Sequence, residues 1–114
     1  MSSTLSLARR LRPRARWGYY AYPYCYNMGP THMYERCAEE VFKENDGLAW
    51  LWEGSGALFP STYVSRSQSR AQAAALVRGR VREAARLAAG LAARPPILPY
   101  FWYKYRDSSG FLPK

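Results

Sequence analysis

The sequence predicts a mainly α-helical fold with long irregular extended arms, little or no sheet and no transmembrane span. Residues 65–94 consist almost wholly of helix-favouring residues, and residues 31–46 show the spacing of an amphipathic helix. The remaining segments are aromatic and are interrupted by Gly and Pro, which is typical of extended or irregular chain. No apolar run approaches the roughly 18–20 residues of a membrane helix.

Composition divides the 114 residues into four parts. Apolar residues make up 48% of the chain, but many are Ala or Tyr, and isoleucine occurs once, at Ile97. Because a self-sufficient core draws on Leu, Ile, Val and Phe, we expect this chain to fold against partners. The four parts are a basic arm (1–16), a Tyr-rich extended segment (17–30), a helical region (31–94) and a Pro/aromatic extended tail (95–114).

The net charge of +9 is unevenly distributed. Residues 1–34 contain five Arg and no acid, residues 35–53 contain six acids, and residues 54–114 contain ten bases against two acids. Basic surface of this kind suits nucleic acid, an anionic membrane face or an acidic protein partner. Ordinary solubility is the alternative interpretation.

The basic arm has the composition of a mitochondrial targeting segment, because it is rich in Ser, Leu, Ala and Arg and contains no acid. On a helix, Leu5, Ala8 and Leu11 would share one side. Pro13 would end that helix. A disordered basic arm is the alternative.

Tyrosines alternate with smaller residues in the second part of the chain. In an extended chain this period of two places the rings on one side, and Pro23 favours an edge or polyproline-like ribbon. We predict that the rings pack into a groove of a protein partner, with stacking on RNA bases as the alternative. The candidate contact residues are Tyr20, Tyr22, Tyr24 and Tyr26.

An acidic helix is predicted over residues 31–46. Thr31 is its candidate N-cap, and Gly47 stands where a left-handed residue commonly ends a helix. Glutamates occupy the solvated face. The apolar face comprises Met33, Tyr34, Cys37, Ala38, Val41 and Phe42.

The same region offers only three candidate metal ligands, Cys25, His32 and Cys37, whereas a structural zinc site needs four. Two cysteines do not make a disulfide framework, so we expect a reducing compartment. No nucleophile is suggested beside His32. We therefore expect no metal, no cofactor, no catalytic residue and no enzymatic activity.

The long helix over 65–94 follows an irregular link (47–64) and ends before Pro95. Ser61, Ser65 and Ser67 are its candidate caps. One face consists of small residues suited to close helix packing, and arginines wind round the other. These basic candidates for contact with protein, lipid headgroups or RNA are Arg70, Arg78, Arg82 and Arg86.

The tail places aromatic residues beside Lys104 and Arg106. Such a mixture is typical of a membrane-interface belt or of an anchor in a protein interface. The candidate contact residues here are Tyr100, Trp102 and Tyr105.

Together these features predict a non-catalytic accessory subunit of a large mitochondrial assembly, such as a respiratory-chain complex or ATP synthase. It would lie peripheral to the inner membrane and contact other protein subunits and anionic lipid headgroups, with no small-molecule substrate. The alternative is a mitochondrial ribosomal protein that binds rRNA through its arginines. The acidic middle and the aromatic content favour the first hypothesis.

Overall fold

A computed structural model describes residues 2–27 and 36–113, and its regular structure is helical. Within the described residues, pairing between extended segments is limited to isolated bridges, so the prediction of a mainly helical chain with little or no sheet is confirmed. No helix in this described part combines the length and apolarity needed to cross a bilayer. The helices are α1 (Ser2–Leu11), α2 (Glu39–Asp46), α3 (Ala49–Glu53) and α4 (Arg70–Ala89).

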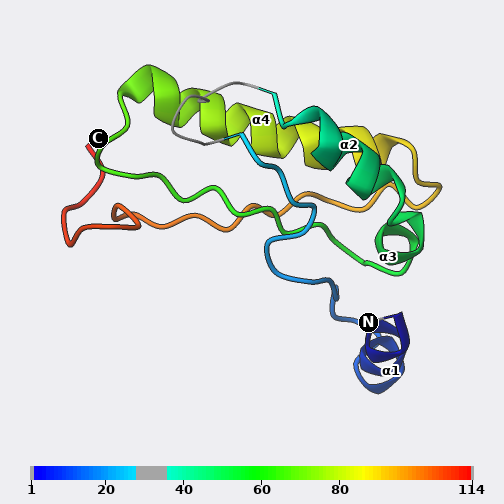
Figure 1. The fold of residues 1–114 in the computed structure, drawn as a ribbon. Coiled ribbons are helices and arrows are strands. Elements are labelled where there is room, and N and C mark those ends of the chain that lie inside the picture. Colours follow the sequence, from blue (N-terminus) through cyan, green and yellow to red (C-terminus); the bar gives the residue numbers. More distant parts are fainter. Residues whose placement is uncertain (1, 28–35, 114) are drawn as a thin grey trace.

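Three extended segments lie beneath α4, and their bridges are parallel. Tyr20 pairs with Phe59, and Ser61 pairs with Tyr100. We call residues 17–22, 57–62 and 96–101 the first, central and last segments. Figure 1 shows the central and last segments running side by side, with α4 returning the chain between them as a helical crossover. The carboxyl ends of all three segments therefore meet at one edge.

The two aromatic stretches thus lie against the central segment, although the sequence predicts that they form separate arms. The Ala21 amide donates to the Phe59 carbonyl at 3.0 Å, and the Tyr100 amide donates to the Pro60 carbonyl at 2.9 Å. These backbone bonds join segments that are far apart in the sequence. Local periodicity carries no information about such pairing.

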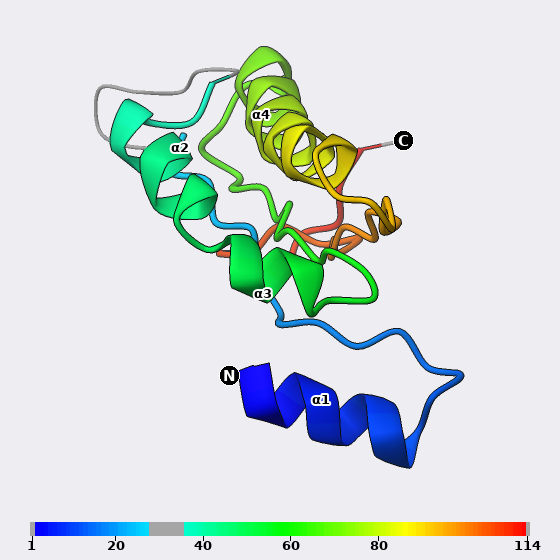
Figure 2. The same ribbon diagram turned by 90° about the vertical axis from the view of Figure 1, so that its right-hand side faces the viewer.

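The core lies between α4, α3 and the central segment. Leu51 and Leu58 are 1% exposed, and α4 contributes Ala84, which is fully buried. Leu5 of α1 is 4% exposed and belongs to the same cluster. Figure 2 shows α1 as a separate rod below α3. The small-residue face of α4 is therefore used within this chain, and α1 is part of the fold.

The long helix is shorter than predicted at both ends. Its N-cap is Ser69, whose hydroxyl accepts from the Gln72 amide while the Gln72 side chain accepts from the Ser69 amide. Ser65 instead begins a separate turn in which its amide donates to the Gln68 side chain. Gly90 ends the helix before Pro95 is reached.

The acidic helix begins at Glu39, eight positions after the predicted start at Thr31. Residues 31–35 of that prediction lie outside the described part of the chain. Cys37 is not helical, because the Ala38 amide donates to the Tyr26 carbonyl and holds the backbone extended. Gly47 ends α2 with an ordinary φ of −72°, where a left-handed residue was expected. The next helix, α3, has five residues, too few for a periodic pattern to reveal it.

Candidate functional site

Three tyrosines gather where the parallel segments end. The rings of Tyr20 and Tyr100 lie edge-on with centroids 5.0 Å apart, and both side chains are about half exposed. Tyr63 follows the central segment. Its hydrogen bond to Tyr20, together with desolvation, raises the pKa of its phenol, which stays protonated at neutral pH. We call Tyr20, Tyr63 and Tyr100 the tyrosine edge.

Beyond the first segment, burial alternates as the period-two pattern predicts. Pro23, Cys25 and Asn27 face inward, whereas the tyrosines between them remain exposed. The exposed fractions are 37% for Tyr22, 46% for Tyr24 and 42% for Tyr26. An aromatic surface therefore continues from the tyrosine edge along the chain.

Arg80 of α4 reaches beneath this surface. Its Nη1 donates to the Ser61 carbonyl at 2.9 Å, and its Nε donates to Asn27 Oδ1 at 3.2 Å. Burial lowers its pKa, but a guanidinium remains charged at neutral pH. Arg80 also lines a cavity of about 160 Å³ together with Tyr24 and Ala21. The site thus combines exposed aromatic rings with one partly buried cation.

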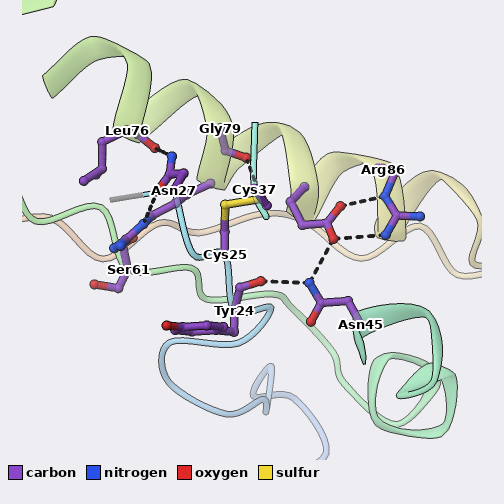
Figure 3. Close-up of a disulfide and its surroundings, with 11 residues drawn as sticks. Tyr24, Cys25, Asn27, Cys37, Asn45, Ser61, Leu76, Gly79 and Arg86 are labelled. Carbon is purple, nitrogen blue, oxygen red and sulfur yellow. Dashed lines mark hydrogen bonds and ion pairs between the residues drawn. A yellow bond between two sulfur atoms is a disulfide. The ribbon is translucent and has the colours of Figure 1, made fainter. Parts of the chain in front are cut away.

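A disulfide joins residues 23–27, which continue the first segment, to Cys37, and a polar network joins them to α2 and α4, as Figure 3 shows. Cys25 and Cys37 are bonded to each other, which answers a point that the sequence left open and disagrees with the expected reducing compartment. Asn45 of α2 donates to the Tyr24 carbonyl at 2.7 Å and to Glu83 of α4 at 2.8 Å. Cys25 and Cys37 were also two of the three candidate zinc ligands, and the disulfide occupies both. The third candidate, His32, lies outside the described residues.

Comparison with known proteins gives the family. The family model for hyaluronidase, glycoside hydrolase family 56, matches residues 1–114. The chain belongs to the hyaluronidase family. It is 45% identical to a hyaluronidase of Apis mellifera over 108 residues, which is 94% of this chain and 28% of that protein. Hyaluronidase B of Vespa velutina is 43% identical over 110 residues, covering 96% of this chain and 33% of the relative.

A solved hyaluronidase shares the fold. The crystal structure of bee venom hyaluronidase matches with a TM-score of 0.88 and 45% identity, over 94% of this chain and 34% of that one. Another structure of the bee enzyme, in complex with a hyaluronic acid tetramer, matches with the same TM-score of 0.88. This chain therefore spans about a third of the length of the hyaluronidases it matches.

Membership of the hyaluronidase family overturns the functional prediction. The chain is not an accessory subunit of a mitochondrial respiratory complex or ATP synthase, nor a ribosomal protein, and the expectation of a non-enzyme is wrong. The predicted location at the inner membrane is therefore wrong. The predicted partners (protein subunits, lipid headgroups or rRNA) and the expectation of no substrate are wrong for the same reason. The basic N-terminus resembled a targeting segment, but α1 inserts Leu5 into the core. The spacing of Leu and Ala in this segment therefore reflects packing within the fold.

The structure brings together only some of the residues that the sequence proposed as contacts. Tyr20 and Tyr100 meet at the tyrosine edge, while Tyr22 lies 6.4 Å from the Trp52 ring. The Trp102 ring is covered by Lys104 Nζ at 5.2 Å in the tail. Tyr105 lies in the same tail, where its amide donates to the Gly110 carbonyl. Trp102 and Tyr105 therefore lie in the tail, after Tyr100, and form an aromatic group separate from the tyrosine edge.

The arginines predicted as contacts lie along α4. Arg86 donates to Glu83 at 2.6 Å and to Asp46 at 2.8 Å, which raises its pKa. Arg70 occupies the first turn, and Arg78 and Arg82 are exposed farther along the helix. Whether these arginines contact a partner stays a prediction.

Sequence reasoning missed Tyr63 and Arg80. Tyr63 is the residue after the central segment, and its position matters only once the parallel pairing is known. Arg80 departs from the four-residue spacing of the other arginines on α4, which was the available signal that it points elsewhere. Both became visible through contacts between distant segments.

Proposed function

We propose that this chain forms part of the substrate-binding face of an enzyme that hydrolyses hyaluronan. The tyrosine edge carries the proposal, because it lies where parallel segments joined by a helix end. In proteins of α/β architecture, ligands bind outside the carboxyl ends of parallel strands. The family match and the relative crystallised with a hyaluronic acid tetramer supply the substrate class.

The chemistry of the edge suits this polymer. Hyaluronan alternates an N-acetylated amino sugar with a uronic acid, so it presents hydroxyls, amides and one carboxylate per repeat. The hydroxyls of Tyr20, Tyr63 and Tyr100 can donate to these oxygens, while the ring faces cover the apolar faces of the sugars. Arg80 adds positive potential beneath the first segment, which favours the uronate.

We propose that this region binds substrate and that other groups carry out proton transfer. Glycoside hydrolysis commonly uses a pair of carboxyl groups on either side of the scissile bond. Within the described residues, Glu83 is buried against Asn45 and Arg86, and Asp107 accepts from the Ser65 hydroxyl and the Arg66 amide. These internal bonds leave both carboxylates in structural roles.

We further propose that the protein works in an oxidising compartment. The disulfide between Cys25 and Cys37 supports this, because such bonds persist mainly in secreted and extracellular proteins. The venom origin of the bee relative agrees with it.

The exposed tyrosines Tyr22 and Tyr24 would extend the sugar-binding surface beyond the tyrosine edge.

Titration of the chain with a hyaluronan tetrasaccharide, followed by calorimetry, tests the proposal. We expect the double variant Tyr20→Ala/Tyr100→Ala to bind at least about tenfold more weakly, because two stacking and donor groups are lost. Tyr103→Ala is the matched control, since Tyr103 stacks on Phe111 in the tail. Equal affinities of wild type and double variant would contradict the proposal.

A further inference from the structure

We propose that a cluster of arginines next to α1 binds a second stretch of the same acidic polysaccharide, away from the tyrosine edge. The choice of ligand rests on the proposed function, whereas the site itself rests on separate residues. Arg9, Arg14 and Arg16 line an open cavity of about 530 Å³ together with Trp17 and Gly56. We call Arg9, Arg14 and Arg16 the arginine cluster.

The backbone that carries the cluster is held in place by several bonds. The Trp17 indole donates to the Arg12 carbonyl at 3.0 Å, and the Gly56 amide donates to the Trp17 carbonyl at 2.7 Å. A Cβ on Gly56 would stand 3.2 Å from the Trp17 amide nitrogen and 3.3 Å from Arg16 Cα, so the two backbones are in close contact. The connection from α1 to the first segment is therefore pre-organised for binding, which reduces the entropy lost with a ligand.

Among residues 2–27 and 36–113, no acidic side chain forms an ion pair with the arginines of this region. All five arginines between Arg9 and Arg16 are exposed, and residues 1–34 contain no acid. The side-chain bonds recorded for them run to carbonyls, from Arg12 to Leu11 and from Arg16 to Gly56. Exposed guanidinium groups bind carboxylates and sulfates through paired N–H donors.

A polysaccharide fits this region better than an anionic membrane does. A helix that binds a membrane surface needs its apolar face free to enter the lipid. Leu5 of that face is 4% exposed and packed in the core, so the apolar surface left on α1 is reduced to Leu7 and Leu11, which are 46% and 60% exposed. Trp17 lines the same cavity as the arginine cluster and provides an aromatic surface for a sugar ring.

The cluster and the tyrosine edge lie at different places along the first segment. Trp17 begins that segment, whereas Tyr20 stands at its other end, about 10 Å away in extended chain. The helix α1, which carries Arg9, lies farther still from that end of the first segment (Figure 1). We expect binding of a tetrasaccharide at the tyrosine edge to depend chiefly on Tyr20 and Tyr100, while a long polymer contacts both surfaces.

The test compares affinities for long hyaluronan, of about twenty repeats, at several salt concentrations. Arg9→Gln/Arg14→Gln/Arg16→Gln should weaken binding of the polymer at least about tenfold at low salt and make its salt dependence shallower. Lys43→Gln/Arg66→Gln/Arg94→Gln removes the same charge from other exposed sites and should change affinity less than threefold. Arg9→Gln/Arg14→Gln keeps the Arg16 bond to Gly56 and should show most of the loss, which guards against misfolding.

Three results would overturn the inference. They are wild-type affinity of the cluster variants for the polymer, an equal loss in the control variant, and a loss of binding to phosphatidylserine vesicles with hyaluronan binding unchanged. The tetrasaccharide separates this inference from the proposed function, because its binding should depend chiefly on Tyr20 and Tyr100. If the tetrasaccharide fails to bind while polymer affinity still depends on the cluster, the proposed function fails and the arginine site stands.

Discussion

Asn45 and Glu83 meet in the interior, where Asn45 Nδ2 donates to Glu83 Oε2 at 2.8 Å and both residues are 2% exposed. The same Asn45 nitrogen donates to the Tyr24 carbonyl, and the Trp52 indole donates to the Asn45 carbonyl. Arg86 completes the bonding of the Glu83 carboxylate. One pair of side chains thus connects the first segment's continuation with α2, α3 and α4.

Removal of the Glu83 carboxylate should destabilise the chain strongly. Glu83→Ala leaves one Asn45 N–H without its acceptor and the Arg86 guanidinium without its nearest anion. We expect a loss of about 2–3 kcal/mol in unfolding free energy, below the usual cost of breaking a buried pair because Arg86 is 42% exposed. Urea denaturation measures it. The matched control, Glu53→Ala on the surface of α3, should stay within about 0.5 kcal/mol.

Loss of the disulfide should also lower stability. Cys25 and Cys37 are separated by twelve positions, and opening a loop of that size releases chain entropy worth about 3 kcal/mol in the unfolded state. Cys25→Ser/Cys37→Ser should therefore lower the urea midpoint. A reductant should shift wild type to the same midpoint and leave the variant unchanged. An unchanged urea midpoint of the wild type after complete reduction of the disulfide would contradict this account.

The phenol of Tyr63 should titrate above its ordinary pKa of about 10, because Tyr20 and desolvation favour its neutral form. A raised folded-state pKa stabilises the fold at pH values below the unfolded pKa. This contribution disappears as the pH rises through the folded pKa, so the stability that Tyr63 adds should decline above about pH 10.

Tyr20→Phe should lower the pKa of Tyr63 by removing their hydrogen bond. Carbon-13 NMR of labelled tyrosine rings follows each phenol separately. Tyr103→Phe is the control and should leave the Tyr63 titration in place, because Tyr103 packs on Phe111 in the tail. An unchanged Tyr63 titration in Tyr20→Phe would contradict the hydrogen bond between Tyr20 and Tyr63.

Gly18 should not tolerate a side chain. A Cβ there would stand 2.6 Å from the Ala57 carbonyl oxygen and 2.8 Å from the Phe59 ring, so the first and central segments would have to separate. We expect Gly18→Ala to cost about 1–3 kcal/mol, measured by thermal unfolding. Gly90→Ala is the contrast, because its Cβ would meet only the Leu87 carbonyl at 3.6 Å. That variant should be neutral or slightly stabilising.

The sequence predicted well what depends on neighbouring residues. The long helix was visible in its composition, although its N-cap, Ser69, was not among the serines proposed from the sequence. The outward tyrosines followed from period-two alternation and Pro23. In contrast, α3 was too short to show a period. The charge and the N-terminal composition were interpreted as a mitochondrial signature, and the family match shows that interpretation to be wrong.

What the sequence determined by itself is therefore local: the helical stretches, the alternation of the tyrosines and the concentration of arginine before Trp17. These depend on φ/ψ preference and side-chain periodicity within a few residues. The tertiary structure decided the parallel pairing that brings Tyr20, Tyr63 and Tyr100 to one edge, and the bond between Cys25 and Cys37. Such contacts join residues far apart in the chain, where burial and hydrogen bonding of the whole fold select the partners.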